Sequence, residues 1–363
     1  MSGLGAPGSP RPFSPRLLGV GLMLALPFLL LVSVRVGVTG VLDLEGTLQG
    51  LGAVLGLGEP LGGTAQTILE LRLWRVLTTA GVGAALALSG SLVQGLFRNG
   101  LAAPSLLGVT GGASLGATIG ILLLGGYGPA LMAVEDAGVR TFVVPVFGFA
   151  GAFGAVLLVA ALASRAGRFS VPTLLLTGIA VNTCIAGVLS LLSSLLLDDW
   201  EVSRAILSWT FGTLADRSAW HVATVWAGLG LSALVVPFLA WELDLLQGGE
   251  EDAQGLGVDV RRVRLLAVGA ASLAAASAVA VAGQIAFLGL VVPHLLRLLS
   301  GSGHKGLLPL SLPGGAVFLL GVELLNRGLL AERALAPGVV MSLVGGPFFV
   351  LLLLLAKRES ETW

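Results

Sequence analysis

The sequence QGGEEDAQGLGVDVRRVR at residues 247–264 is followed directly by the apolar run LLAVGAASLAAASAVAVAG at residues 265–283. The first stretch holds seven charged residues in eighteen positions, whereas only 11% of the whole chain is charged. The second stretch has the length that a helix needs to cross the ~30 Å hydrocarbon core of a bilayer. Together they predict a charged segment at the membrane surface that leads into a membrane-spanning helix.

Four apolar residues recur inside the charged stretch at spacings of three, four and three, which places them on one helical face: Ala253, Leu256, Val260 and Val263. Gly255 and Gly257 interrupt this pattern and predict a bend between two short helices. A small charged element with an apolar face is suited to docking on a partner outside the bilayer. The charge pattern by itself supports a solvated loop between two membrane helices equally well.

The composition indicates an all-α, polytopic membrane protein. Hydrophobic residues make up 55% of the chain, the mean hydropathy is +0.97, and the 54 glycines suit close helix packing in lipid. The formal net charge of zero gives no indication of a nucleic-acid partner. Cys184 is the only cysteine, so the chain has neither an intrachain disulfide nor a CxxC metal motif. We therefore expect no cofactor and no metal.

Apolar runs near the length of a membrane span recur ten times along the chain. Residues 1–16 are rich in Pro, Ser and Gly and predict a disordered N-terminus, residues 17–356 a single transmembrane domain, and residues 357–363 a tail. The polar segment 198–218 is expected to hold a surface helix. The predicted spans are 17–38, 72–97, 105–125, 141–163, 171–197, 219–241, 265–283, 285–299, 307–326 and 339–356.

An even number of spans places both termini on the same side of the membrane. The loops and termini on that side carry twelve Lys and Arg residues, and the opposite side carries eight. Because Lys and Arg are enriched on the cytoplasmic side, both termini and residues 247–264 are predicted to be cytoplasmic.

Small residues dominate two of the predicted spans. The third span carries glycines four residues apart, which form one ridge that lets a neighbouring backbone approach closely: Gly108, Gly112, Gly116 and Gly120. The seventh is almost entirely alanine and other small residues. We interpret both as packing helices rather than as binding sites.

The polar residues favour neither an enzyme nor an ion-coupled carrier. Glu323 is the only candidate carboxylate within a span, and it lies near the outer end of the ninth. The three histidines, His221, His294 and His304, form no HExxH motif, and no catalytic residues are assigned. A P-loop requires Gly-Lys, which the sequence lacks, so ATP hydrolysis would need another chain.

Several motifs in order resemble one family over residues 65–356. They are RLWR (72–75), GAALALSG (83–90), LLLTGIA (174–180), GEEDA (249–253), LGV (256–258), AGQIAFLGLVVPH (282–294) and GGPFF (345–349). The chain thereby resembles the permease family of bacterial iron-siderophore, haem and vitamin B12 importers, the FecCD type of ABC transporter. It departs from the family pattern at Trp74, Gly100, Glu323 and Ala336, where the family usually has proline, proline, aspartate and leucine.

The resemblance implies a ten-helix subunit that pairs two-fold, with the substrate path between the two copies. Two ATPase subunits would bind the cytoplasmic face, and an extracytoplasmic substrate-binding protein would dock outside. The charged stretch maps to helices that fit a cleft in the ATPase through Glu250, Glu251, Ala253, Leu256, Gly257 and Val260.

Arginines at three positions are implied to meet glutamates on the lobes of the binding protein: Arg72, Arg75 and Arg327. Arg72 and Arg75 are three residues apart, which places them on one helical face. The alternative is that these arginines merely flank the ends of membrane-spanning helices. Arginines are, however, usually less frequent on the outer side of the membrane than on the cytoplasmic side.

We therefore expect a non-catalytic permease subunit of an ATP-driven importer in the bacterial inner membrane. The alternative is an ion-coupled secondary transporter or channel without an ATPase partner, and an intramembrane enzyme ranks third. The sequence does not distinguish haem, iron-siderophore and cobalamin, nor a homodimer from a heterodimer of permeases. It also leaves the gate residues and the role of His294 open, with the fifth and tenth spans as the expected lining of the pathway.

Overall fold

The computed structural model describes residues 13–37, 40–125, 137–165, 170–196, 199–301, 303–330 and 335–360. Nearly all of this part of the chain is helical, in agreement with the predicted class. Of the predicted disordered N-terminus, residues 1–12 lie outside the described residues, and α1 begins at Pro15. Of the predicted C-terminal tail, residues 357–360 belong to α15 and residues 361–363 lie outside the described residues.

The helices follow one another with short connections. The elements are, in chain order, α1 (Pro15–Arg35), β1 (Val36–Gly37), β2 (Gly40–Val41), α2 (Leu44–Val54), α3 (Ala65–Phe97), a 3₁₀ turn η1 (Pro104–Leu107), α4 (Val109–Leu124), α6 (Ala137–Arg165), α7 (Val171–Leu195), α8 (Trp200–Phe211), α9 (Ala219–Ala233), α10 (Val236–Leu246), α11 (Glu250–Gly255), α12 (Val260–Ala282), α13 (Leu288–Ser300), α14 (His304–Leu330) and α15 (Pro337–Ser360).

Local sequence sets many of the helix ends. Side-chain oxygens cap the first turns of several helices, as when Asp199 accepts from the backbone N–H of Val202 at the start of α8. At the end of α4, Gly125 adopts a left-handed conformation with φ +68°, which glycine reaches without steric cost. The surface helix predicted within residues 198–218 is confirmed as α8.

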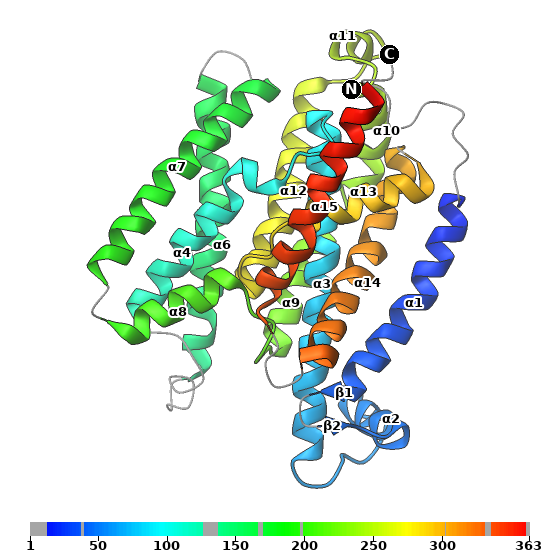
Figure 1. The fold of residues 1–363 in the computed structure, drawn as a ribbon, viewed down its shortest axis with the longest axis vertical. Helices are drawn as coiled ribbons and strands as arrows, with labels where there is room; N and C mark the ends of the chain where they lie inside the picture. The colour runs from blue at the N-terminus through cyan, green and yellow to red at the C-terminus, as the bar shows by residue number, and fades with distance from the viewer. Residues whose placement is uncertain are drawn as a thin grey trace.

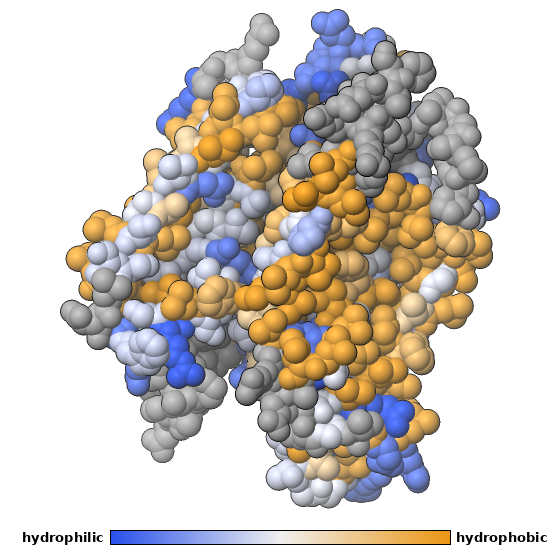
Figure 2. Space-filling view, viewed as in Figure 1, coloured by the Kyte–Doolittle hydropathy of each residue, from blue (hydrophilic) through white to orange (hydrophobic). Residues whose placement is uncertain are grey.

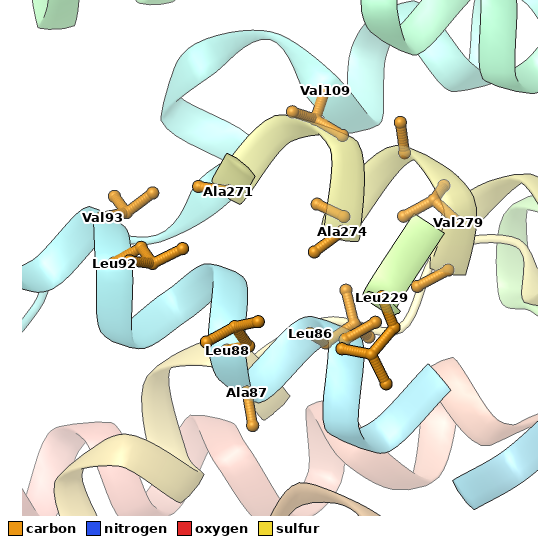
Figure 3. Packing of buried hydrophobic residues seen from close by; sticks show 14 of the residues in the cluster. Leu86, Ala87, Leu88, Leu92, Val93, Val109, Leu229, Ala271, Ala274 and Val279 are labelled. Carbon is orange, nitrogen blue, oxygen red and sulfur yellow. The ribbon is translucent and has the colours of Figure 1, made fainter. Parts of the chain in front are cut away.

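Helix α3 forms the centre of the bundle, and it is buried without interruption from Thr78 to Phe97. It contacts α14, α12, α13 and α9, while α4, α6 and α7 pack together on one flank and α1 lies on the opposite flank (Figure 1). Figure 3 shows the packing of Leu88 and Leu92 of α3 near Ala271 and Ala274 of α12. Small side chains allow these helices to approach closely, as the sequence of the seventh span predicted.

Six helices in the described part of the chain are long and apolar enough to cross a membrane, or seven if α9 and α10 form one span. Three shorter apolar helices are Val109–Leu124, Leu288–Ser300 and Pro337–Leu351. These segments coincide with the ten predicted ranges, but ten complete crossings remain a prediction. The predicted sixth span is not one straight helix: α9 and α10 meet at an angle of 54°.

The first predicted span ends earlier than expected. Helix α1 stops at Arg35, and the chain then forms a two-stranded antiparallel hairpin in which Val36 pairs with Val41 and Gly37 with Gly40. This hairpin and α2 lie at one end of the molecule, and α11 lies at the other (Figure 1). We refer to these as the hairpin end and the α11 end.

The surface supports a membrane-embedded molecule. Large hydrophobic side chains are exposed along α1 and α7, including Leu24 at 69% and Leu176 at 69%. Figure 2 shows apolar residues across the middle of the visible face, with hydrophilic residues gathered toward the ends. Because such a surface would be costly in water, it indicates contact with lipid or with another membrane chain.

Candidate functional site: the α11 end and the hairpin end

The charged stretch forms a bent element at the α11 end. Gly249 and Gly257 have φ of +137° and +87°, so both ends of α11 turn through conformations that favour glycine. Asp259 then caps α12 by accepting from the N–H of Arg262 at 3.0 Å. The bend is as predicted, but the second short helix is not separate, because Val260 already begins the long helix α12.

The apolar stripe predicted to face a partner faces mostly inward. Ala253 and Val263 are fully buried and Val260 is 5% exposed, because all three pack into the protein's own core. Leu256 is the exception at 68% exposed. The expectation of a four-residue docking stripe is therefore wrong: the bend turns Leu256 outward while its helical neighbours turn in.

The acidic residues of α11 also differ in their surroundings. Glu250 forms an ion pair with Arg264 of α12, which ties the start of α11 to the helix that follows it. Glu251 and Asp252 are exposed. The outward surface of the element includes Glu251, Asp252, Leu256 and Gly257, which we call the α11 tip.

A buried histidine links the helix before α11 to α14. Asp244 of α10 accepts two hydrogen bonds of 2.7 Å from His304, one from the backbone N–H and one from ring Nδ1. The neighbouring Lys305 places its ammonium 4.1 Å from the centre of the Trp241 ring. Sequence reasoning missed this link, because no spacing relates residues about sixty positions apart.

Arg72 organises the hairpin end from inside. It is 7% exposed and donates to the backbone carbonyls of Arg35 at 2.7 Å, Gly40 at 2.9 Å and Val34 at 3.3 Å. The planar guanidinium can serve several carbonyls at once, which explains how the end of α1 and the hairpin are held together.

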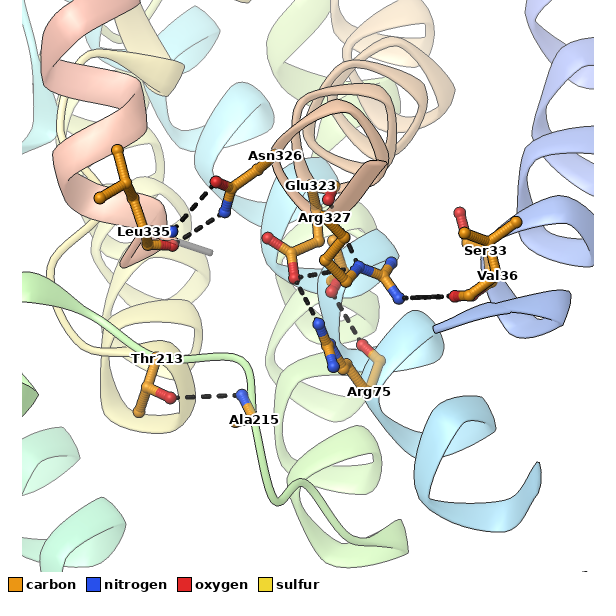
Figure 4. A network of polar contacts seen from close by, with 10 residues as sticks. Ser33, Val36, Arg75, Thr213, Ala215, Glu323, Asn326, Arg327 and Leu335 are labelled. Carbon is orange, nitrogen blue, oxygen red and sulfur yellow. Dashed lines mark hydrogen bonds and ion pairs between the residues drawn. The ribbon is translucent and has the colours of Figure 1, made fainter. Parts of the chain in front are cut away.

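Arg75 and Arg327 share one carboxylate. Arg75 Nη2 lies 3.0 Å and Arg327 Nε 3.5 Å from Glu323 Oε1, and Arg327 also donates to the carbonyl of Val36 at 3.2 Å (Figure 4). Arg327 is 4% exposed, whereas the Arg75 side chain is 23% exposed. Arg72 and Arg327 are therefore buried and bond within the protein, and of the three arginines predicted to meet a binding protein only Arg75 is partly exposed. That docking stays a prediction.

A cavity opens beside this ion cluster. It has a volume of about 460 Å³ and lies between α8, the loop after α8, the end of α14 and the start of α15. We call it the outer cavity. Its lining comprises Arg75, Arg204, Leu207, Ser208, Phe211, Gly212, Thr213, Leu214, Ala215, Glu323, Asn326, Leu335, Ala336 and Pro337.

The glycine ridge of α4 lies against α6. A Cβ on Gly112 or Gly116 would collide with the backbone of α6 at Gly151 or Phe147, and one on Gly120 would lie 3.2 Å from Val144 Cα. Gly108 instead occupies the left-handed turn before α4, with φ +88°. Three glycines thus permit close helix contact, and the fourth permits the turn.

His294 lies on α13 with its ring 6.0 Å from that of Phe348, and its Nε2 is buried without a hydrogen-bond partner in the described structure. No group of three or more His, Cys, Asp or Glu residues within the described ranges is arranged to hold a metal ion.

Comparison with known proteins defines the class. The FecCD transport family model matches residues 22–355, and the chain belongs to this family. A solved structure described as "An inward-facing conformation of a putative metal-chelate type ABC transporter" is similar with a TM-score of 0.75 and 30% identity, covering 93% of this chain and 99% of that one.

Two relatives of this chain are permease proteins of named import systems. The cobalamin import system permease protein BtuC of Halobacterium salinarum is 39% identical over 80% of this chain and 74% of its own length. The hemin transport system permease protein HmuU of Yersinia pestis is 38% identical over 81% of this chain and 84% of its own length. The resemblance stated from the sequence motifs is thereby confirmed.

Proposed function

We propose that the chain is the membrane subunit of an ATP-driven importer for a corrinoid, haem or iron chelate. The observation that carries this proposal is the family match across almost the whole chain, together with the shared permease fold. The relatives named above import cobalamin and hemin, which suggests the substrate class. The chain contains no P-loop, so a separate ATPase chain would supply the energy.

The coupling contact with that ATPase is proposed at the α11 tip. Leu256 is an exposed apolar residue flanked by the exposed charges of Glu251 and Asp252, a combination suited to a small interface in which an apolar anchor is surrounded by polar residues. Ala253 and Val260 would hold the tip in position by packing into the core, and Glu250 would do so through its ion pair with Arg264. The tip is proposed to lie in the cytoplasm.

Substitutions at the tip test the coupling. We expect Leu256→Asp to lower ATP-dependent uptake by about tenfold or more, since a residue at the centre of an interface dominates its energy. Glu251→Lys should lower uptake less, because a charge at the edge of an interface mainly guides association and orientation. ATPase activity should become insensitive to substrate in the same variants. Uptake and hydrolysis are measured together in proteoliposomes that contain the full transporter.

The control is Arg165→Glu, a charge reversal at an exposed position at the end of α6, outside both the α11 tip and the hairpin end. It should leave coupling unchanged. Glu250→Lys is a poorer probe because it also breaks the pair with Arg264. Wild-type uptake in both tip variants would show that the tip does not transmit the energy.

A substrate-binding protein is proposed to dock at the hairpin end, as the resemblance implies. Arg75 is the most accessible of the three arginines, while Arg72 and Arg327 would shape the docking surface by holding the hairpin. Two copies of the permease are proposed to pair in the plasma membrane. The substrate pathway between them would open alternately to one side of the membrane and to the other.

A further inference from the structure

The outer cavity carries a surplus of positive charge. Its lining contains the guanidinium groups of Arg75 and Arg204 and the carboxylate of Glu323. Arg327 stands beside Glu323 and shares that carboxylate with Arg75. Within the lining, two guanidinium groups face one carboxylate, and that carboxylate is also engaged by the buried Arg327.

The hydrogen-bonding capacity of Arg75 is not exhausted. Its Nη2 donates to Glu323, whereas its Nε is buried without a hydrogen-bond partner. An arginine offers five N–H donors in a planar fork that matches a carboxylate. Nε is enclosed by the protein, so an acceptor that enters the cavity would meet the outer part of the guanidinium, which the 23% exposure of the Arg75 side chain leaves accessible.

The surroundings favour an anion as the occupant. Arg204 on α8 is exposed and adds a second positive charge to the lining. The cavity also meets the N-terminal end of α15 at Pro337, where the helix dipole contributes a partial positive charge. Asn326 is already committed to the backbone of Leu335, so the arginines are the principal recognition groups.

We propose that the outer cavity binds the carboxylate groups of a small anionic solute between Arg75 and Arg204. Its volume lies within the range typical of small-molecule sites, about 300–1,000 Å³. The inference rests on the proposed function only where it takes the solute to be the transported substrate. Among the proposed substrates, this site would favour a chelate that bears carboxylates over a neutral corrinoid. Glu323 limits the affinity, because it competes with the solute for Arg75.

Radiolabelled citrate is a suitable probe. The permease is purified with its ATPase partner in nanodiscs, without binding protein and without nucleotide, and equilibrium binding is measured. We expect saturable binding of one citrate per permease copy that weakens as salt is added. Arg204→Gln should lower the affinity about tenfold, and Arg75→Gln at least as much.

Arg35→Gln is the matched control, because Arg35 also lies at the hairpin end but outside the lining. It should bind citrate as the wild type does. Arg204 is exposed, so its variant remains informative if Arg75→Gln fails to fold. Absence of saturable binding, or equal affinity in the wild type and Arg204→Gln, would overturn the proposal.

A partner protein could also supply carboxylates, and a second assay separates the two sources. If Arg204→Gln weakens capture of the binding protein while citrate binding is unchanged, the cavity serves the partner and the proposal is wrong. Because no transport or ATP hydrolysis is measured, these results are independent of the importer function tested through the α11 tip.

Discussion

Arg72 illustrates what one residue can decide in this protein. Its position in the RLWR motif suggested an outward contact, yet its guanidinium donates to the carbonyls of Arg35 at the end of α1 and of Gly40 in β2. Carbonyl groups near a helix end lack intrahelical partners, and an internal arginine satisfies them. Its removal should therefore affect the local fold before it affects any partner.

We expect Arg72→Lys to destabilise the hairpin end by about 1–3 kcal/mol, because an ammonium cannot serve the same carbonyls in a fixed fork. The amide protons of β1 and β2 should exchange faster, as measured by hydrogen–deuterium exchange. Arg261→Lys, at an exposed site near the α11 end, should leave this exchange unchanged. Equal protection in both variants would exclude the anchoring role.

At the scale of elements, the contact between α4 and α6 depends on glycine pairs. Gly112 and Gly151 lie so close that a methyl group on either would meet the backbone of the other helix. Gly154, one turn along α6 from Gly151, has open space where its Cβ would be. Substituting each of these two glycines of α6 by alanine therefore separates the effect of close helix packing from the effect of helix propensity.

Gly151→Ala should lower stability by about 1–3 kcal/mol, because the helices must separate to admit the methyl group. Gly154→Ala should be neutral or stabilising by up to about 1 kcal/mol, since alanine favours the helix. Thermal unfolding of the purified protein in detergent measures both. A similar midpoint for the two variants would contradict the packing role.

The contact between helices α10 and α14 suggests how motion at the α11 tip could reach the core. Helix α10 is bent away from α9 and is held to α14 through Asp244 and His304. The α11 tip follows directly after α10 in the chain. A displacement of the tip would therefore be passed to α14, which contacts the central helix α3.

At the scale of the whole molecule, the importer and the ion-coupled carrier make different predictions. The buried carboxylate Glu323 is already engaged by two arginines, which makes it a poor site for reversible ion binding. We expect uptake to stop when ATP is depleted and to persist when ion gradients are collapsed. Uptake by the permease alone, without ATP, would favour the carrier.

Much of the architecture was accessible from the sequence because hydrophobic length and small-residue spacing are local properties. The ten apolar ranges coincide with helices, and Gly112 and Gly116 lie on a close contact as their spacing predicted. The break between α9 and α10 was missed, because the apolar run continues through it. The outer cavity was also missed, because it joins residues from α3, α8, α14 and α15.

The sequence by itself determined that this is a helical membrane protein with a charged bend at one end, since each apolar run and the bend are contiguous stretches. Its ordered motifs carried the resemblance to the permease family. Only the tertiary structure decided which way individual side chains face. Ala253 and Val260 turn inward, Leu256 turns outward, and Arg72 and Arg327 hold the hairpin from within. The physical reason is that burial and ion pairing depend on neighbours far away in the chain, which no local spacing specifies.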